Sequence, residues 1–504
     1  MNELNIINFK SKANVTNNFF YLLLTFLTVF FTFSFSETKN SGDDMSGKDN
    51  LLKVSGDHIV NQNGETIVLR GFGLGGMLHM ENFIDGYPSN EETMREGLLK
   101  VLGKKKYDLY FDNFLKSYFT EPDAEYIHNL GLNLVRIPIN YHLFEDDMNP
   151  GVIKEEAFKY LDNVINLCAK YQIYTIIDLH ALPGCQNQHW HSDNPTQKAF
   201  FWLQKDFQDR ALHLWEVIAD HYKDHPWVAG YDLINEPADP SGEKLFPYYK
   251  RLYNAVRKVD PNHIMFLEGD RYAKDFSMFT EVWDNVVYTN HDYAAPGFTG
   301  NYPGYTNGKY YEKDTLENDF LKKSEFMLSH KVPIWVGEFG PVYTNDPGKD
   351  ETRYQVLKDQ LAYYKKYKVS WCIWLYKDLG LQAIIHQKEN TPYMKLVSSF
   401  LKKKDYLGAD AWGSSDKNIR QVIEPIEELF KKEFNDYDPY PAGQKRHIAL
   451  LVRNILIAEA LVPEYCNLFK GLSDEELISV AQSFRFENYV KRQRLENILS
   501  GQEE

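Results

Sequence analysis

The sequence has few cysteines, and none of them are paired at short spacing. The four are Cys168, Cys185, Cys372 and Cys466. Zinc sites and thioredoxin-like motifs place two cysteines a few residues apart, and disulfide-stapled domains need more of them. The sequence therefore implies neither a disulfide framework nor a zinc knuckle.

Positive charge is also scarce. Lysine and arginine number 56 against 71 aspartates and glutamates, which gives a formal net charge of −15. A surface of this sign repels polyanions, so we expect no nucleic acid as a partner, whereas neutral polymers are compatible with it. The hydrophobic content of 43% is ordinary for a globular protein and excludes a disordered or collagen-like chain.

One long apolar run, residues 19–35, follows two lysines and precedes the small residue Ser36. This order is typical of an export signal, so we predict a secreted protein whose signal spans residues 1–36. The run is also about long enough for a membrane anchor, and a protein tethered by residues 19–36 is the alternative. Residues 37–50 contain almost no apolar side chains and are predicted to form a flexible linker.

Short β-branched runs alternate with longer segments of helical periodicity from residue 51 onward. The eight candidate strands are Ile67–Gly71, Asn133–Ile137, Tyr174–Leu179, Val228–Ile234, Ile264–Leu267, Val286–Thr289, Pro333–Val336 and Ser370–Leu375. This alternation predicts an α/β fold, a (β/α)8 TIM barrel over residues 51–435. The glycine-rich stretch 71–76 opens no obvious helix, which disfavours a nucleotide site.

Two additions to the barrel are predicted. Asn63-Gly64 lies between two apolar runs, and this dipeptide supplies the positive φ angles of a tight turn, so we expect an N-terminal β-hairpin. Residues 436–504 show helical patterns, and no linker rich in proline, glycine or serine separates them from the barrel. We predict C-terminal helices that pack on the barrel or complete it.

Two glutamates close two of the predicted strands. Glu236 stands in Asn-Glu-Pro after the fourth strand, and Glu338 stands in Gly-Glu-Phe-Gly after the seventh. Active sites of such barrels are built at the C-terminal ends of the strands. Two carboxyl groups about 5 Å apart suffice to cleave a glycosidic bond with retention, one as acid and one as nucleophile. In such a pair the charged nucleophile is expected to raise the pKa of the acid.

These two motifs, in this strand order, resemble glycoside hydrolase family 5, the cellulase-like retaining barrels, and the resemblance covers residues 51–379. It implies that Glu338 is the nucleophile and Glu236 the acid and then the base. Six further residues match the family in strand order: Arg136, His180, Asn235, His291, Tyr293 and Trp374. The resemblance implies that the arginine holds the nucleophile, that His180 and Asn235 contact the sugar, that His291 and Tyr293 border the carboxylates, and that Trp374 stacks on the ring.

The resemblance implies an endo-β-1,4-glucanase-like enzyme that hydrolyses β-linked glucan or oligosaccharide, without a cofactor or metal, and that we expect to be a monomer. Alternatives within the family are an exo-acting β-1,3-glucanase, a β-glucosidase or a glycolipid glycosidase. Outside it stand a catalytically silent carbohydrate-binding barrel and a metal-dependent hydrolase using His180, His189 and His191. Trp190 and Trp202 are further candidate platforms for outer sugar units.

Overall fold

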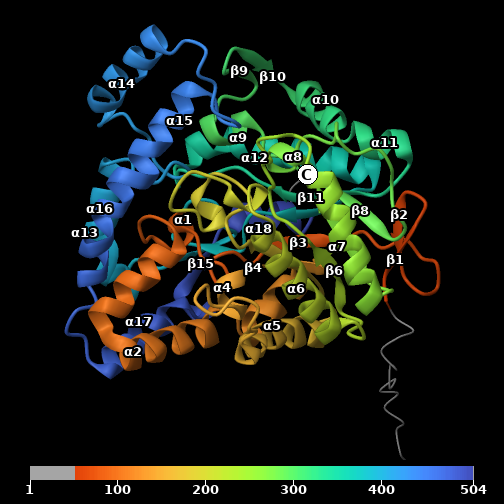
Figure 1. Ribbon diagram of the computed structural model, residues 1–504, viewed down its shortest axis with the longest axis horizontal. Coiled ribbons are helices and arrows are strands. Elements are labelled where there is room, and N and C mark those ends of the chain that lie inside the picture. Colours follow the sequence, from red (N-terminus) through yellow and green to blue (C-terminus); the bar gives the residue numbers. More distant parts are fainter. Residues whose placement is uncertain (1–50, 503–504) are drawn as a thin grey trace, which may run out of the picture. The chain divides into compact units, whose positions relative to one another are not determined.

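The structure is a computed structural model that describes residues 51–502 (Figure 1). The predicted signal or anchor, residues 1–36, and the predicted linker, residues 37–50, lie outside the described residues. Within the described part of the chain, no helix has both the length and the apolarity needed to cross a membrane.

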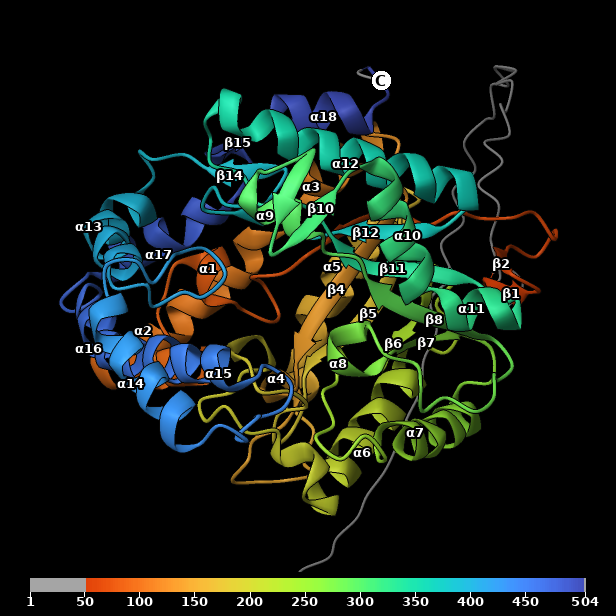
Figure 2. The same ribbon diagram turned by 90° about the horizontal axis from the view of Figure 1, so that it is seen from above.

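Eight parallel strands form the closed barrel that the sequence predicts, and helices surround them (Figure 2). The strands are β3 (Arg70–Gly73), β4 (Leu134–Asn140), β5 (Tyr174–Ala181), β6 (Val228–Asp232), β7 (Ile264–Glu268), β8 (Val286–His291), β11 (Ile334–Phe339) and β12 (Ser370–Ile373). Each strand pairs with the next one along this series, and β12 closes on β3. The predicted (β/α)8 fold is confirmed.

The alternation of side chains along the strands produces two apolar layers. Leu134, Ile176 and Phe266 belong to a cluster inside the barrel, whereas the next residues along β4 and β5, Val135 and Ile177, belong to the larger cluster between strands and helices. Because side chains of a strand alternate between its faces, the residues two positions further on also point inward. Those residues are polar, and they form the floor of the site described below.

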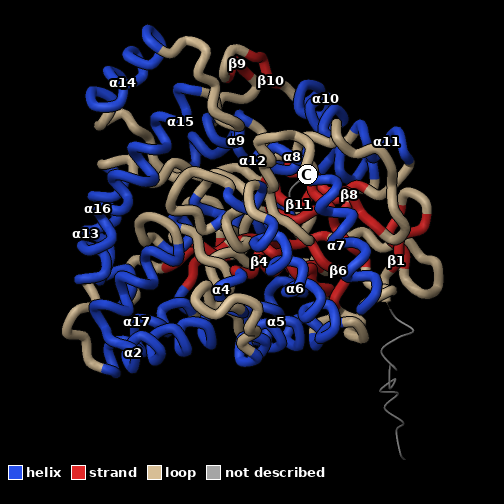
Figure 3. Tube along the Cα trace, in the orientation of Figure 1, coloured by secondary structure: helices blue, strands red, loops and turns tan. Residues whose placement is uncertain are grey.

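Helices cover the outside of the barrel (Figure 3). They are α2 (Glu91–Tyr118), α3 (Glu121–Asn129), α5 (Phe158–Lys170), α6 (Lys205–Tyr222), α7 (Leu245–Val259), α10 (Lys313–Lys323), α11 (Glu325–His330), α12 (Pro347–Tyr367) and α13 (Pro392–Tyr406). Short elements lie in the connections: α1 (Asn82–Asp85), α4 (Tyr141–Phe144), α8 (Asp270–Ala273), α9 (Ala295–Thr299), β9 (Gly304–Thr306) and β10 (Lys309–Tyr311). In α5 the buried residues Leu161, Ile165 and Cys168 recur at helical spacing, so this cysteine packs as an apolar side chain.

The N-terminal hairpin differs from the prediction in its turn. Strands β1 (Lys53–Ser55) and β2 (His58–Val60) pair across Gly56, which has a φ of +59°. The predicted turn at Asn63-Gly64 also exists: Val60 bridges antiparallel to Thr66 across it, and the Asn61 side chain accepts hydrogen bonds from main-chain N–H groups. Gly56, which tolerates this φ angle, thus provides an additional turn before the predicted one.

The C-terminal part adds further helices. They are α14 (Arg420–Glu433), α15 (Gln444–Leu450), α16 (Ala458–Asn467), α17 (Asp474–Ala481) and α18 (Gln493–Leu499), with a π-helical segment at Leu451–Ile457 between α15 and α16. Helices α14 to α17 lie on one flank, and α18 lies beside α12 (Figure 2). Helices α16 and α17 pack on α2. A small sheet of β13 (Lys377–Asp378), β14 (Ile385–Gln387) and β15 (Tyr489–Lys491) joins the end of the chain to the segment after the last barrel strand.

Candidate active site

The two predicted carboxylates face each other at the C-terminal end of the barrel. One oxygen of Glu236, one oxygen of Glu338 and one ring nitrogen of His291 all lie within 4.8 Å of one another. Retaining glycosidases hold their two carboxyl groups about 5 Å apart, whereas inverting enzymes need a wider gap for a water molecule. The separation therefore fits attack by one of the carboxylates on a sugar bound between them.

A β-bulge turns Glu338 into the site. Val336 belongs to the outer apolar cluster, so regular alternation would also point Glu338 outward. The register between β11 and β8 shifts after Val336, and Glu338 then pairs with His291. A bulge of this kind re-aims a side chain. Gly337 permits it, because a Cβ atom there would lie 3.0 Å from Nε2 of His291.

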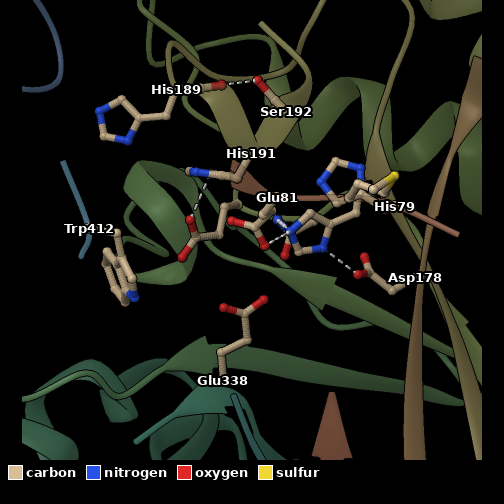
Figure 4. A network of polar contacts seen from close by, with 12 residues as sticks. His79, Glu81, Asp178, His189, His191, Ser192, Glu338 and Trp412 are labelled. Carbon is tan, nitrogen blue, oxygen red and sulfur yellow. Dashed lines mark hydrogen bonds and ion pairs between the residues drawn. The ribbon is translucent and has the colours of Figure 1, made fainter. Parts of the chain in front are cut away.

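Both oxygens of Glu338 accept a hydrogen bond from a predicted residue. Arg136 donates from Nη1 to Oε1 at 2.7 Å, and the Tyr293 hydroxyl donates to Oε2 at 2.9 Å. The two hydrogen bonds fix the orientation of the carboxylate, which faces the cavity. In Figure 4 the Glu338 carboxylate points toward the space that Trp412, Glu81 and His191 border.

Arg136 is fully buried among carboxylates of neighbouring barrel strands. Its guanidinium also contacts Asp178 at 3.1 Å, Asp232 at 2.9 Å and Glu268 at 3.2 Å. Burial raises the pKa values of Asp178 and Asp232 well above their usual range. The same guanidinium donates to Asn235 Oδ1 at 2.8 Å, which fixes the amide beside Glu236.

Glu236 has a different setting, between two histidines. Nδ1 of His291 lies 2.7 Å from its Oε1, and Nε2 of His191 lies 3.1 Å from its Oε2. Its main-chain N–H donates to Glu268 at 2.6 Å, and its φ of +46° departs from the extended strand that precedes it. This bend turns the side chain from the strand direction into the cavity.

The pKa of Glu236 differs from the sequence-based prediction. Burial acts to raise it, but hydrogen bonds from His191 and His291 outweigh burial and hold this pKa well below its usual range. Burial likewise acts to lower the pKa of His291, yet the charges of Glu268 and Glu338 raise it well above the ordinary value. The two opposite shifts favour a shared proton on His291, whose Nδ1 lies 2.7 Å from the Glu236 carboxylate.

The predicted sugar-contacting residues lie together on one wall. His180 is stacked on Trp374 with ring centroids 5.4 Å apart and an angle of 8°. Nδ1 of His180 lies 2.7 Å from Asp178, and its Nε2 lies 3.1 Å from Nδ2 of Asn235. Trp374 closes the side next to β3, where Gly73 leaves room, since a Cβ there would lie 2.5 Å from the indole.

A cavity of about 390 Å³ contains the predicted residues His180, Glu236, Tyr293, Glu338 and Trp374 in its wall. Arg136, Asn235 and His291 lie directly behind them. The other lining residues are Glu81, Phe83, His189, Trp190, His191, Tyr272, Lys274, Phe298, Ala411, Trp412, Arg446, Ala449, Leu450 and Arg453. Trp202 does not reach the cavity; it is buried and donates to the carbonyl of Gln186 at 2.8 Å.

Glu81 was missed in the sequence although a signal existed. It follows the glycine-rich stretch after β3, and that stretch leaves the C-terminal end of the first barrel strand. Burial, and then the charges of Glu338 and Glu236, raise the pKa of Glu81 well above its usual range. This shift favours the protonated form of the carboxyl group, and a protonated carboxyl group is able to donate a hydrogen bond.

Asp193 anchors the loop that contains His189 and His191. Its side chain accepts hydrogen bonds from Nδ2 of Asn90 and of Asn140, each at 2.7 Å, and lies 3.3 Å from His142. A polar residue in a loop thus positions a histidine that contacts Glu236.

Stability is expected to fall with rising pH through His142. Burial acts to lower its pKa, but hydrogen bonds to Asp147 and Asp193 raise the pKa from 6.5 to about 10. A raised pKa means that the folded protein binds the proton more tightly, so this contribution is complete below pH 6.5 and is lost as pH rises toward 10. Urea unfolding should show roughly 1–3 kcal/mol more loss between these pH values for the native protein than for His142→Gln. Equal losses in the two proteins would contradict the assignment.

Two groups of side chains in the cavity could also hold a metal ion. His79, Glu81 and His180 bring donor atoms within 4.8 Å of one another, as do Glu236, His291 and Glu338. The sequence suggested another set of metal ligands, His180, His189 and His191. These three histidines do not form such a group among residues 51–502. Cleavage of a glycosidic bond by two carboxyl groups requires no metal.

Comparison with known proteins adds to this geometry. The family model Cellulase (glycosyl hydrolase family 5) matches residues 106–380, more than half of the chain. A protein of Phanerodontia chrysosporium named β-xylosidase is 46% identical over 464 residues, which cover 89% of this chain and 97% of that protein. Endoglucanase C of Acetivibrio thermocellus is 23% identical over 59% of this chain and 95% of its own length.

Among solved structures, an endoglucanase from Thermotoga maritima is 22% identical, with a TM-score of 0.43 over 51% of this chain and 82% of its own. The family match and the long alignment at 46% identity agree with the two carboxylates and the barrel that presents them. The chain belongs to glycoside hydrolase family 5 and is a glycosidase.

Proposed function

We propose that this protein hydrolyses β-linked glucan or β-glucosides by double displacement, with Glu338 as nucleophile and Glu236 as acid and then base. The observation that supports this most directly is the pair of carboxylates within 4.8 Å, one held by Arg136 and Tyr293 and the other by two histidines. The two glutamates thus have different hydrogen-bond partners, as two different roles require.

In the first step Glu338 attacks the anomeric carbon while the leaving oxygen takes a proton from Glu236. The proton reaches Glu236 from His291, whose Nδ1 is 2.7 Å from the carboxylate. When sugar displaces water from the cavity, desolvation disfavours the separated charges of this pair and favours the neutral carboxylic acid. In the second step Glu236 accepts a proton from water, and that water releases the sugar from Glu338.

A second candidate is cleavage of β-xylosides. The relative at 46% identity is named a β-xylosidase and aligns over 97% of its length, which supports this candidate. Glucose and xylose differ by one hydroxymethyl group, so the two candidates share the mechanism and differ only in the fit of one substituent.

The experiment that tests the mechanism follows the anomeric configuration of the first product by NMR. Aryl β-glucosides, aryl β-xylosides and soluble β-glucan are incubated with the full chain, and the β-anomer should appear before mutarotation. If the α-anomer is released first, attack by Glu338 is excluded. The ratio of kcat/KM on the glucoside and the xyloside decides between the two candidates.

We also propose that the protein is secreted, or alternatively tethered by residues 19–36. The sequence pattern of residues 1–36 alone supports this proposal. Detection of the protein in culture medium of expressing cells, with an N-terminus near Ser36, would test cleavage.

A further inference from the structure

Part of the cavity wall comes from outside the barrel. Arg446, Ala449, Leu450 and Arg453 line the cavity, and they lie on α15 and on the π-helical segment that follows it. The family model ends at residue 380, so it includes none of them. From Arg446 to Arg453 this element rises by about 10 Å, so its two ends line different parts of the cavity wall. We call residues 444–457, together with the loop 408–414, the roof.

The first end of the roof lies on the side of Glu236. Arg446 lines the cavity and lies close enough to His189, Tyr272 and Lys274 to interact electrostatically with all three. The ring of His189 is stacked on Tyr272 at 5.0 Å, and the loop that contains His189 also presents His191 to Glu236. Since Glu236 protonates the leaving oxygen, this end borders the leaving group.

The second end of the roof is fastened by one arginine. Arg453 is 9% exposed, and its guanidinium donates to the carbonyl oxygens of Gly408 at 2.6 Å, Asp410 at 3.0 Å and Ser414 at 2.6 Å. Three main-chain acceptors on one short loop fit the planar fork of an arginine and not the single ammonium of a lysine. Arg453 therefore sets the position of the loop that contains Trp412.

Trp412 borders the nucleophile. Its indole N–H donates to Oε1 of Gln382 at 2.9 Å, and its ring packs at 5.2 Å from Tyr293, the residue that donates to Glu338. It also contacts Phe83 at 6.0 Å and Phe298 at 4.8 Å. Figure 4 shows its ring on the border of the space in front of Glu338. The ring is thus placed beside the sugar that Glu338 attacks.

We propose that the roof closes the side of the cavity that receives this sugar, so that the enzyme takes the end of a glycan chain and releases short units from it. Trp412 contacts the terminal sugar, and Arg453 acts as its positioning residue. When a polymer is cut internally, its chain continues on both sides of the attacked sugar. Trp412, Phe83 and the rest of the roof occupy the space that the chain needs on one of these sides. The inference rests on the proposed hydrolysis of β-glycosides.

The test has two parts. In the first, the native full chain is given a soluble β-glucan, and new reducing ends are counted while viscosity is followed. A closed side predicts many reducing ends with little loss of viscosity, and predicts that a β-gluco-oligosaccharide labelled at its reducing end is shortened stepwise. A rapid loss of viscosity with few new ends would overturn the inference.

In the second part, Trp412→Ala and Arg453→Ala are compared with Arg420→Ala on an aryl β-glycoside. Arg420 is a matched arginine of the C-terminal part, paired with Asp416 and Glu427 and absent from the catalytic cavity. We expect KM to rise about 5- to 10-fold in the first two variants, with a smaller change in kcat, and no change in the third.

If Arg453→Ala does not fold, the Trp412 variant still tests the inference. Replacing an indole at the border of the cavity leaves no buried charged group without a partner. Unchanged KM in folded Trp412→Ala would overturn the role of the roof. Absence of turnover on every glycoside by the native protein would instead contradict the proposed function, so the two failures are distinguishable.

Discussion

Glu338→Gln is expected to lower kcat by roughly 10⁴- to 10⁶-fold on every glycoside, whatever its leaving group. The amide keeps the size of the side chain but cannot form the glycosyl ester, and it cannot balance the positive charge that develops on the sugar. Initial rates with an aryl β-glycoside bearing a highly activated leaving group measure the loss. That substrate removes any dependence on the acid and leaves only the effect on the nucleophile.

The fold should survive this substitution. Arg136 keeps Asp178, Asp232 and Glu268 as partners, so no buried cation is left alone. Glu96→Gln is the matched control, because Glu96 is an exposed helical residue paired with Lys100 and absent from the cavity wall. Near-normal turnover by Glu338→Gln with a native melting temperature would exclude Glu338 as nucleophile. A slow-reacting 2-fluoro glycoside should, in the native protein, label the peptide that contains Glu338.

The positions of the catalytic residues were predictable because they depend on local rules. Strand period and strand order place Arg136 and Glu236 at one end of the barrel, and the family resemblance, confirmed by the comparisons, ranks them among many polar residues. Glu338 is a partial exception. Strict alternation points it away from the site, and the bulge at Gly337 that reverses it could be predicted only from the motif.

Residues supplied by distant segments could not be predicted. Trp412 and Arg453 reach the cavity through a loop and a π-helical segment, and neither has a periodic pattern that relates it to a barrel strand. Helix α13 was also missed between the last strand and the predicted C-terminal helices. Contacts between residues far apart in sequence depend on the whole packing, which a single sequence does not display.

The protonation of Glu236 shows the same limit. A pair of carboxylates alone predicts a raised pKa for the acid. The structure adds His191, brought by a loop that Asp193 ties to Asn90 and Asn140. Two histidine contacts reverse the direction of the shift, and only one of the two histidines had been placed beside the carboxylates.

Glu236→Gln is expected to separate the two steps of the reaction. With a leaving group that needs a proton, kcat/KM should fall about 10²- to 10⁴-fold, the usual contribution of a positioned acid. With a leaving group that departs unaided, Glu338 still attacks, but no base activates the water that must release the sugar. Stopped-flow measurement should then show a burst of aglycone equal to the enzyme concentration, followed by slow turnover.

Azide distinguishes the loss of the base from the loss of the acid in the Glu236→Gln variant. Azide is small, anionic and needs no base, so adding it should restore turnover of the activated substrate and yield a β-glycosyl azide, while it should not restore the substrate with the poor leaving group. Glu92→Gln, a partly exposed glutamate away from the cavity, is the matched control. Equal losses on both substrates, without a burst, would mean that Glu236 supports the structure of the site rather than transferring a proton. His291 would then be the remaining group close enough to both carboxylates, at 2.7 Å and 3.7 Å, to serve as the acid.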